Sequence, residues 1–254
     1  MNGNRLLSVL RRDRAVVLGC LGVVVLLAWA YILAGGAVAM PKMPMGGTMG
    51  AMREWTLGYA GLVFVMWCVM MAAMMLPSTA PVTLLVARIA GQRAGGATLL
   101  FVLGYLSVWF AFSVAATALQ WALNRAGLLS DGWALANSVL AGVVLLAAGI
   151  YQWTPLKAAC LRHCRSPLDF ILFHWRDGPI GAYASGAGHG FFCLGCCWML
   201  MALLFVGGIM SVVWIGAIAL LVLVEKTLPW GEHAGRLAGG ALAVWGIGTL
   251  AMAI

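Results

Sequence analysis

The chain has 254 residues, of which 64% are hydrophobic and only 9% are charged, and its mean hydropathy is +1.01. Soluble domains carry about 25% charged residues, so this composition excludes an ordinary water-soluble protein and predicts that lipid surrounds the chain. The formal net charge of +8 does not indicate nucleic-acid binding. The basic residues lie in short connections and near the N-terminus, without a basic stripe interleaved with aromatics.

Seven apolar stretches are long enough to cross a bilayer, which takes about 20 residues for about 30 Å of hydrocarbon. In chain order they cover about residues 15–35, 59–76, 97–123, 133–153, 180–206, 209–224 and 237–254. The second is expected to stop at Pro77, and the fifth and sixth to form a hairpin through Gly207-Gly208. We therefore predict an all-α, polytopic integral membrane protein of about seven transmembrane helices, with one membrane domain over residues 1–254.

The distribution of basic residues predicts the orientation. Most arginines and lysines precede the first span, follow the second, or lie between the fourth and fifth or the sixth and seventh. Only Lys42, Arg53 and Arg125 fall on the opposite side, so the positive-inside rule predicts a cytoplasmic N-terminus in a bacterial inner membrane. Residues 37–39 resemble a signal-peptidase site, but the apolar run before them exceeds the ~7–15 residues of a signal peptide. We expect an uncleaved first span.

Soft potential metal ligands occur in four places, of which the first is the outer loop over residues 40–52. It contains five methionines spaced by proline and glycine, and Met43, Met45 and Met49 are the candidate ligands. Thioethers are neutral, soft donors that favour Cu(I). The alternative is a flexible connection that happens to be rich in methionine.

The second place is the face of the second span formed by Met66, Met70 and Met74, which recur at i, i+4 and i+8. Residues at this spacing stack along one side of a helix. Such a stripe is a candidate path for a soft metal ion. It is also compatible with plain packing, because in a bilayer the hydrophobic effect does not distinguish methionine from leucine.

The third and strongest place is the fifth span, where His189, Cys193 and Cys197 recur at i, i+4 and i+8 and Cys196 is adjacent. One imidazole and three thiols on one helical face suit Cu(I) or Zn(II). An intramembrane histidine is costly without a partner and therefore indicates function, whereas buried cysteines also serve as small packing residues. Glycines indicate close packing of this span: Gly181, Gly186, Gly188, Gly190 and Gly195.

The fourth place is the connection after the fourth span, which carries Cys160, His163 and Cys164. These side chains could receive or release a soft metal at the cytoplasmic face, form a redox pair, or merely anchor the segment. A structural disulfide is not expected in the reducing cytoplasm. Glu225, at the end of the sixth span, is a further candidate ligand if it approaches His189; its alternatives are pairing with Lys226 or capping a neighbouring helix.

The depths of these groups suggest that they form one path. At 1.5 Å per residue, Met70 and Cys193 both fall near the midplane of antiparallel spans. Met74 and His189 fall in the inner half. If the second, fifth and sixth spans touch, sulfur and nitrogen donors form a ladder from the methionine-rich loop to the cytoplasmic cysteines. The contact between the methionine face and Cys193 is a hypothesis.

Three strings of residues carry a resemblance to a known family. They are M-W-x-x-M-M-A-A-M-M-L-P-S at 66–78, Y-Q-x-T-P-L-K-x-x-C-L-x-x-C-R-S-P at 151–167, and G-x-x-H-G-x-x-C-x-G-C-C-W-M at 186–199, with Glu225-Lys226 downstream. On these strings the chain resembles the DUF2182 family of predicted metal-binding integral membrane proteins of bacteria, over about residues 57–254. The resemblance implies a membrane location and metal binding, without an established metal or reaction.

Three functions are open at this point. The favoured one is binding or handling of a soft metal, copper first and zinc as the alternative, in exchange with a metal donor or acceptor protein. The second is a copper-dependent membrane oxidase or oxygenase acting on an apolar substrate, which needs a cavity beside His189 and Cys193. The third is a metal-free scaffold in which cysteine, methionine and glycine serve helix packing.

Overall fold

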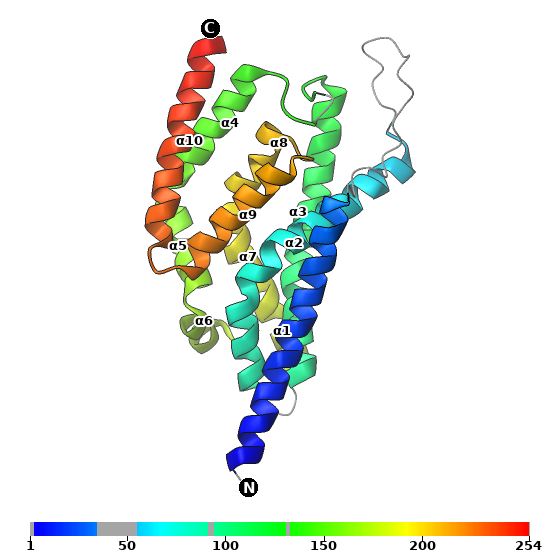
Figure 1. Ribbon diagram of the computed structural model, residues 1–254, viewed down its shortest axis with the longest axis vertical. Coiled ribbons are helices and arrows are strands. Elements are labelled where there is room, and N and C mark those ends of the chain that lie inside the picture. The colour runs from blue at the N-terminus through cyan, green and yellow to red at the C-terminus, as the bar shows by residue number, and fades with distance from the viewer. Residues whose placement is uncertain (1–2, 35–54, 91–93, 131–132, 254) are drawn as a thin grey trace.

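The computed structural model describes residues 3–34, 55–90, 94–130 and 133–253, and its regular elements in these ranges are helices (Figure 1). In chain order they are α1 (Gly3–Leu33), α2 (Leu57–Ile89), α3 (Ala94–Arg125), α4 (Ser138–Tyr151), α5 (Pro155–Arg165), α6 (Pro167–His174), α7 (Gly178–Ala202), α8 (Leu204–Gly207), α9 (Val212–Thr227) and α10 (Gly231–Ala253). The all-α fold class is thus confirmed for the described part of the chain. The methionine-rich loop, with Met43, Met45 and Met49, lies outside the described residues.

Within the described ranges, five helical segments are long and apolar enough to cross a membrane, which supports the expected lipid environment. They are Ala15–Leu33, Leu57–Ile89, Gly95–Arg125, Gly178–Gly207 and Gly231–Ala253. Helices α4 and α5 pass the same test only as a pair bent by 63°, which would give six spans. Helix α9 has 16 residues, fewer than the about 20 that cross hydrocarbon. The predicted number of seven is therefore not confirmed, and the orientation stays a prediction.

The helices form one elongated bundle whose two chain ends point in opposite directions along its long axis (Figure 1). Helix α1 lies along α2 at one side, and α10 lies beside α4 at the other. Helices α7 and α9 occupy the middle, with α3 packed against α7. Helix α5 packs on α7 as well, so α7 joins the first half of the sequence to the second.

Helices α3 and α7 approach so closely that their crossing has no room for a side chain. A Cβ atom added to Gly186 would overlap the backbone carbonyl of Phe101, whose carbon lies 2.7 Å away. A Cβ atom on Gly104 would lie 2.9 Å from the backbone nitrogen of Ala187. Small residues let backbones meet in this way where lipid provides no hydrophobic driving force. The close packing expected from the glycines of this span is confirmed at Gly186, Gly190 and Gly195, whereas Gly181 meets only Arg176 just before α7 and Gly188 faces open space.

We predicted that the second span stops at Pro77, and this was wrong: α2 continues through Pro77 and Pro81 to Ile89. Membrane helices tolerate proline where hydroxyl groups and neighbouring helices satisfy the nearby backbone. Beside Pro77, the hydroxyl of Ser78 donates to the carbonyl of Met75 over 2.8 Å. Near Pro81, the Thr83 hydroxyl donates to the carbonyl of Thr79 over 3.0 Å. The extension matters because it carries Ser78 toward α9.

The fourth predicted span, residues 133–153, is also shorter than expected, since α4 begins only at Ser138. The side chain of Asn137 caps the helix by accepting a hydrogen bond from the backbone of Leu140 over 2.9 Å. Before this cap, Trp133 has a φ of 59°, a left-handed conformation that interrupts a helix. The polypeptide then turns sharply after Tyr151 into α5, so residues first taken as a connection become a packed helix.

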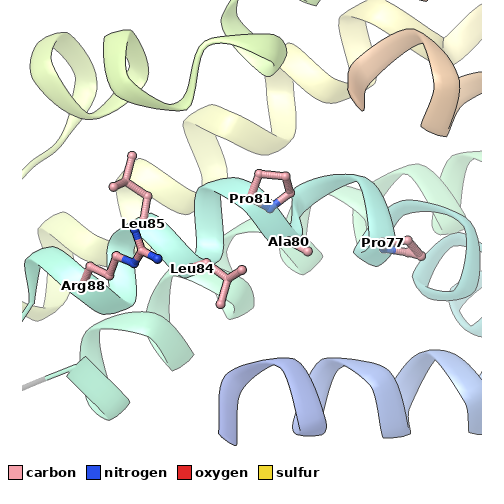
Figure 2. A pocket seen from close by; sticks show the side chains of 6 residues that line it. All are labelled: Pro77, Ala80, Pro81, Leu84, Leu85 and Arg88. Carbon is pink, nitrogen blue, oxygen red and sulfur yellow. The ribbon is translucent and has the colours of Figure 1, made fainter. Parts of the chain in front are cut away.

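An open apolar hollow of about 420 Å³ lies along α2. Figure 2 shows the side chains that line it, which are Pro77, Ala80, Pro81, Leu84, Leu85 and Arg88. No thiol, thioether or imidazole group is among them. This hollow therefore does not belong to the soft-ligand site, which lies in the middle of the bundle.

Candidate metal centre

Helix α7 turns its imidazole and three thiols into the protein. His189 is 2% exposed, and Cys193, Cys196 and Cys197 are 0–1% exposed. Their spacing of i, i+4, i+7 and i+8 predicts one shared face, and the structure buries that face together with the glycines around it. The shared face is thus confirmed, whereas its use as a metal site stays a prediction.

Cys193 lies at the centre of a small polar cluster buried in the bundle. Its sulfur is 2.8 Å from the Nζ atom of Lys226 in α9 and 3.1 Å from the hydroxyl of Tyr105 in α3. The Lys226 ammonium also donates to the Ser78 hydroxyl over 3.2 Å, and the Tyr105 hydroxyl to the carbonyl of Met75 over 3.3 Å. Helices α2, α3, α7 and α9 therefore meet at one thiol.

The other cysteines continue from Cys193 toward α5. The thiols of Cys196 and Cys197 donate to the carbonyl of Cys193 over 3.1 and 2.9 Å. The side chain of Cys164 lies near that of Cys196, and Cys197 lies near both Cys196 and Cys193. The buried side chains of four cysteines from α5 and α7 thus lie close together. We name this group the thiol cluster: Cys164, Cys193, Cys196 and Cys197.

His189 lies one turn before Cys193, in a box of aromatic rings. Its ring centre is 5.0 Å from that of Phe170, 5.8 Å from that of Tyr105 and 6.0 Å from that of Phe101. Its Nδ1 atom has no hydrogen-bond partner among the described residues. A buried polar atom without a partner costs about 1–3 kcal/mol, so this nitrogen is a candidate metal ligand. Tyr105 connects the two groups, with its ring against His189 and its hydroxyl against Cys193.

Glu225 pairs with Lys157 of α5, rather than with Lys226 or His189. Its two carboxylate oxygens lie 2.7 and 2.8 Å from the Lys157 Nζ atom, and both side chains are almost fully buried. The same ammonium contacts the side-chain oxygen of Gln152. This arrangement satisfies Glu225 without a metal, and its role as a ligand stays a prediction.

Two residues of the methionine face lie toward α1 and the start of α9. Met66 and Met70 line a hollow of about 30 Å³ together with Met210. The remaining lining comes from α1 and from residues 209–215, and none of it comes from α7. Met74 is buried in the same core as Cys193. The ladder from this face to His189 and Cys193 therefore stays a prediction, and α2 reaches Cys193 through Met75 and Ser78 instead.

The three residues of the expected cluster on the connection all face α7, but each lies against a different residue of it. Cys164 is buried and belongs to the thiol cluster, whereas the half-buried His163 ring stacks on Phe192. Cys160 lies against the backbone of Gly195, where its sulfur would be 2.7 Å from an added Cβ atom. The three side chains thus do not converge on a common point.

The sequence interpretation missed the roles of Lys226, Tyr105 and Met210. Lys226 carried a signal, because a lysine next to a glutamate at the end of an apolar stretch is expensive in lipid and indicates a buried partner. Tyr105 carried none, since an aromatic residue in an apolar span is ordinary. Met210 is separated from Met66 in sequence, so only the folded chain brings these thioethers together.

The donor set suits a soft ion, although it is not arranged as a closed metal cage. In the described part of the chain, no group of three or more His, Cys, Asp and Glu side chains is positioned around a common ion. The thiols of the thiol cluster lie close together, and those of Cys196 and Cys197 donate hydrogen bonds to the backbone carbonyl of Cys193. Thiolates and thioethers select Cu(I) over hard cations such as Mg²⁺ or Ca²⁺.

These features define a multi-helix membrane protein with buried soft donors. Residues 64–249, well over half of the chain, match the family described as PpoB2, copper chaperone, and the chain belongs to this copper chaperone family. The match begins inside α2, so α1 and the methionine-rich loop lie outside it. The expected relation to copper is thereby supported, whereas the DUF2182 family is not confirmed by name and zinc gains no support. No curated protein and no solved structure matches the chain.

Proposed function

We propose that the protein binds Cu(I) as cargo at the thiol cluster and exchanges it with a donor or acceptor protein at the membrane. The observation that carries this proposal is the group of four buried thiols on α5 and α7, beside a lysine that has no carboxylate partner among the described residues. Membership of a copper chaperone family supports copper as the cargo.

Lys226 supplies the charge that such a site needs. Thiolate ligands carry negative charge, and charge buried in an apolar environment is costly unless it is paired. The ammonium group at 2.8 Å from the Cys193 sulfur offsets this charge when the thiols lose their protons to a metal. Glu225 cannot cancel the Lys226 charge, because its carboxylate is already engaged by Lys157.

His189 is the fifth candidate ligand and lies on the same face as the cysteines. Its Nδ1 atom, which has no hydrogen-bond partner in the described part of the chain, favours a bound ion over a purely structural role. The three thioethers of Met66, Met70 and Met210 around a small hollow are a candidate entry point, since neutral donors hold Cu(I) without adding charge. With the predicted orientation, this hollow faces the outer half of the membrane and the end of α9 faces the cytoplasm.

The test is copper analysis of the purified full-length protein in lipid nanodiscs, loaded with Cu(I) under reducing conditions. The unaltered protein is expected to retain copper in a fixed ratio. The H189A/C193S double variant is expected to lose most of it. Cys20→Ser is the matched control, because Cys20 is an exposed thiol on α1 and its loss leaves the cluster intact.

Two results would contradict the proposal. Absence of stoichiometric copper in the unaltered protein would favour the metal-free scaffold. Equal copper in the double variant and in the Cys20→Ser control would place the ion elsewhere. The oxidase alternative needs a cavity beside His189 and Cys193, and the hollows described above along α2 and between α1, α2 and α9 are not lined by either residue.

A further inference from the structure

A pair of histidines lies outside the thiol cluster, where α5 and α6 meet. The ring centres of His163 and His174 are 5.3 Å apart, and the two rings are nearly perpendicular, at 82°. His163 is half-buried and His174 is exposed. The sequence interpretation grouped His163 with Cys160 and Cys164 and assigned no role to His174, so this pairing is a product of the fold.

The His163 ring is held in the way that metal-binding imidazoles are held. Its Nδ1 atom donates to the carbonyl of Ala159 over 2.9 Å. Its face stacks on Phe192 of α7, with ring centres 4.2 Å apart and planes within 7°. Metal-ligating histidines usually donate one ring N–H to a carbonyl or carboxylate, which leaves the other nitrogen as the ligand. For His163 that other nitrogen is Nε2.

The His174 ring is placed by a second set of contacts. It stacks on Phe170, with ring centres 5.7 Å apart and planes within 4°, and it meets the edge of Phe192 at 5.6 Å. Its backbone carbonyl accepts a hydrogen bond from the Ser185 hydroxyl over 3.2 Å, which ties the end of α6 to α7. Both imidazoles are therefore positioned against Phe192 of α7, with His174 exposed and His163 half-buried.

We propose that His163 and His174 form a two-imidazole copper-exchange site at the surface, next to the thiol cluster. A metal ion bound about 2 Å from a ring nitrogen lies roughly 3 Å from the ring centre, so two rings can share an ion when their centres are up to about 6 Å apart. The observed 5.3 Å meets this condition. The exposure of His174 leaves a side open for a further ligand from a donor or acceptor protein.

The position on α5 connects this site with the proposed function, on which its choice of copper rests. His163 and Cys164 are adjacent, yet one contacts Phe192 near the surface and the other contacts Cys196 in the interior. An ion held by the two imidazoles can thus pass to the thiol of Cys164, the next residue along α5. Nitrogen ligands are less soft than thiolates, so transfer inward to the thiol cluster is favoured.

The test is copper K-edge absorption spectroscopy on the full-length protein in nanodiscs, which separates imidazole from sulfur ligands. Phenylalanine substitution in the H163F/H174F double variant keeps the ring stacking and removes the nitrogens. His233→Phe is the matched control, because His233 is an exposed histidine on α10. Both variants are compared in a His189→Ala background, so that the imidazole signal comes from outside the thiol cluster. In this background H163F/H174F is expected to lose imidazole-bound copper, to keep sulfur-bound copper, and to yield copper to a chelator at least tenfold more slowly than the control.

Each outcome decides between this inference and the proposed function. Imidazole-bound copper that persists equally in H163F/H174F and in the His233→Phe control would overturn the inference, as would an unchanged release rate. Sulfur-bound copper alone in the unaltered protein would support the thiol cluster as the copper site and refute the histidine site. Imidazole-bound copper alone, unaffected by Cys193→Ser, would support the histidine site and refute the thiol cluster as a copper site. Absence of both imidazole-bound and sulfur-bound copper would refute both proposals.

Discussion

Replacing Glu225 with glutamine removes the negative partner of a buried ion pair and leaves the Lys157 ammonium group without a counter-charge. The two side chains are 1% and 3% exposed and lie 2.7 Å apart, so water cannot replace the lost carboxylate. Removal of one partner from such a pair typically costs about 3–5 kcal/mol. For a chain of this size, this loss corresponds to a fall in Tm of roughly 6–20 °C. Thermal unfolding in nanodiscs, followed by circular dichroism, measures the change.

Two comparisons make this prediction specific. The K157M/E225Q double variant removes both charges and is expected to recover most of the loss, since replacing a whole buried pair is often neutral. The exposed pair Arg236–Glu232, at 55% and 45% exposure, is the control, and Glu232→Gln is expected to change stability by less than about 1 kcal/mol. A fall in Tm no larger than that of the control would refute the reasoning. Copper loss in the double variant at full stability would instead indicate that Glu225 is a ligand.

Two further predictions concern the packing and the charge of the site. Gly186→Val is expected to lower the free energy of unfolding by about 1–3 kcal/mol, because the new side chain would overlap the carbonyl of Phe101. Gly188→Val is the control and should leave the Tm unchanged, because Gly188 faces open space. Equal effects of the two substitutions would show that α3 and α7 do not cross as described. Lys226→Met is expected to lower the Cu(I) affinity about tenfold or more, about 1.4 kcal/mol, because it leaves the thiolate charge at Cys193 unpaired. Lys226→Arg, which keeps the positive charge, is expected to retain the affinity. Unchanged affinity of Lys226→Met in a chelator competition would contradict the charge argument.

The face of α7 shows what helical periodicity can predict in a membrane protein. The spacing of His189, Cys193 and Cys197 predicted one side of one helix, and the structure buries all three. Local sequence also indicated the break at Gly207-Gly208, where Gly208 adopts a φ of 90°. These features depend on residues within one or two turns of each other, and such features are readable without knowledge of the fold.

The partners of that face were not readable, because they depend on which helices touch. Pairing of Glu225 with Lys226 was one of three alternatives because the two are neighbours in sequence, yet they point to different helices. One meets Cys193 of α7 and the other meets Lys157 of α5. Consecutive residues on a helix are 100° apart, so adjacent charges seldom face each other. The pairing therefore depends on tertiary structure.

Helix α5 explains why the interpretation of the connection after the fourth span was incomplete. Its buried residues are Lys157, Leu161 and Cys164, at i, i+4 and i+7, which is the spacing of a helix packed on one side. The pattern was obscured because a lysine occupies the first buried position, and lysines are almost never buried without a partner. That partner is Glu225, 68 residues away. The ion pair thus holds α5 against α9 while the same face of α5 carries Cys164 to Cys196. The Lys157 charge, which obscured the helical pattern of α5 in the sequence, therefore also holds Cys164 in the thiol cluster. We expect the stability of the ion pair and the integrity of the proposed copper site to change together.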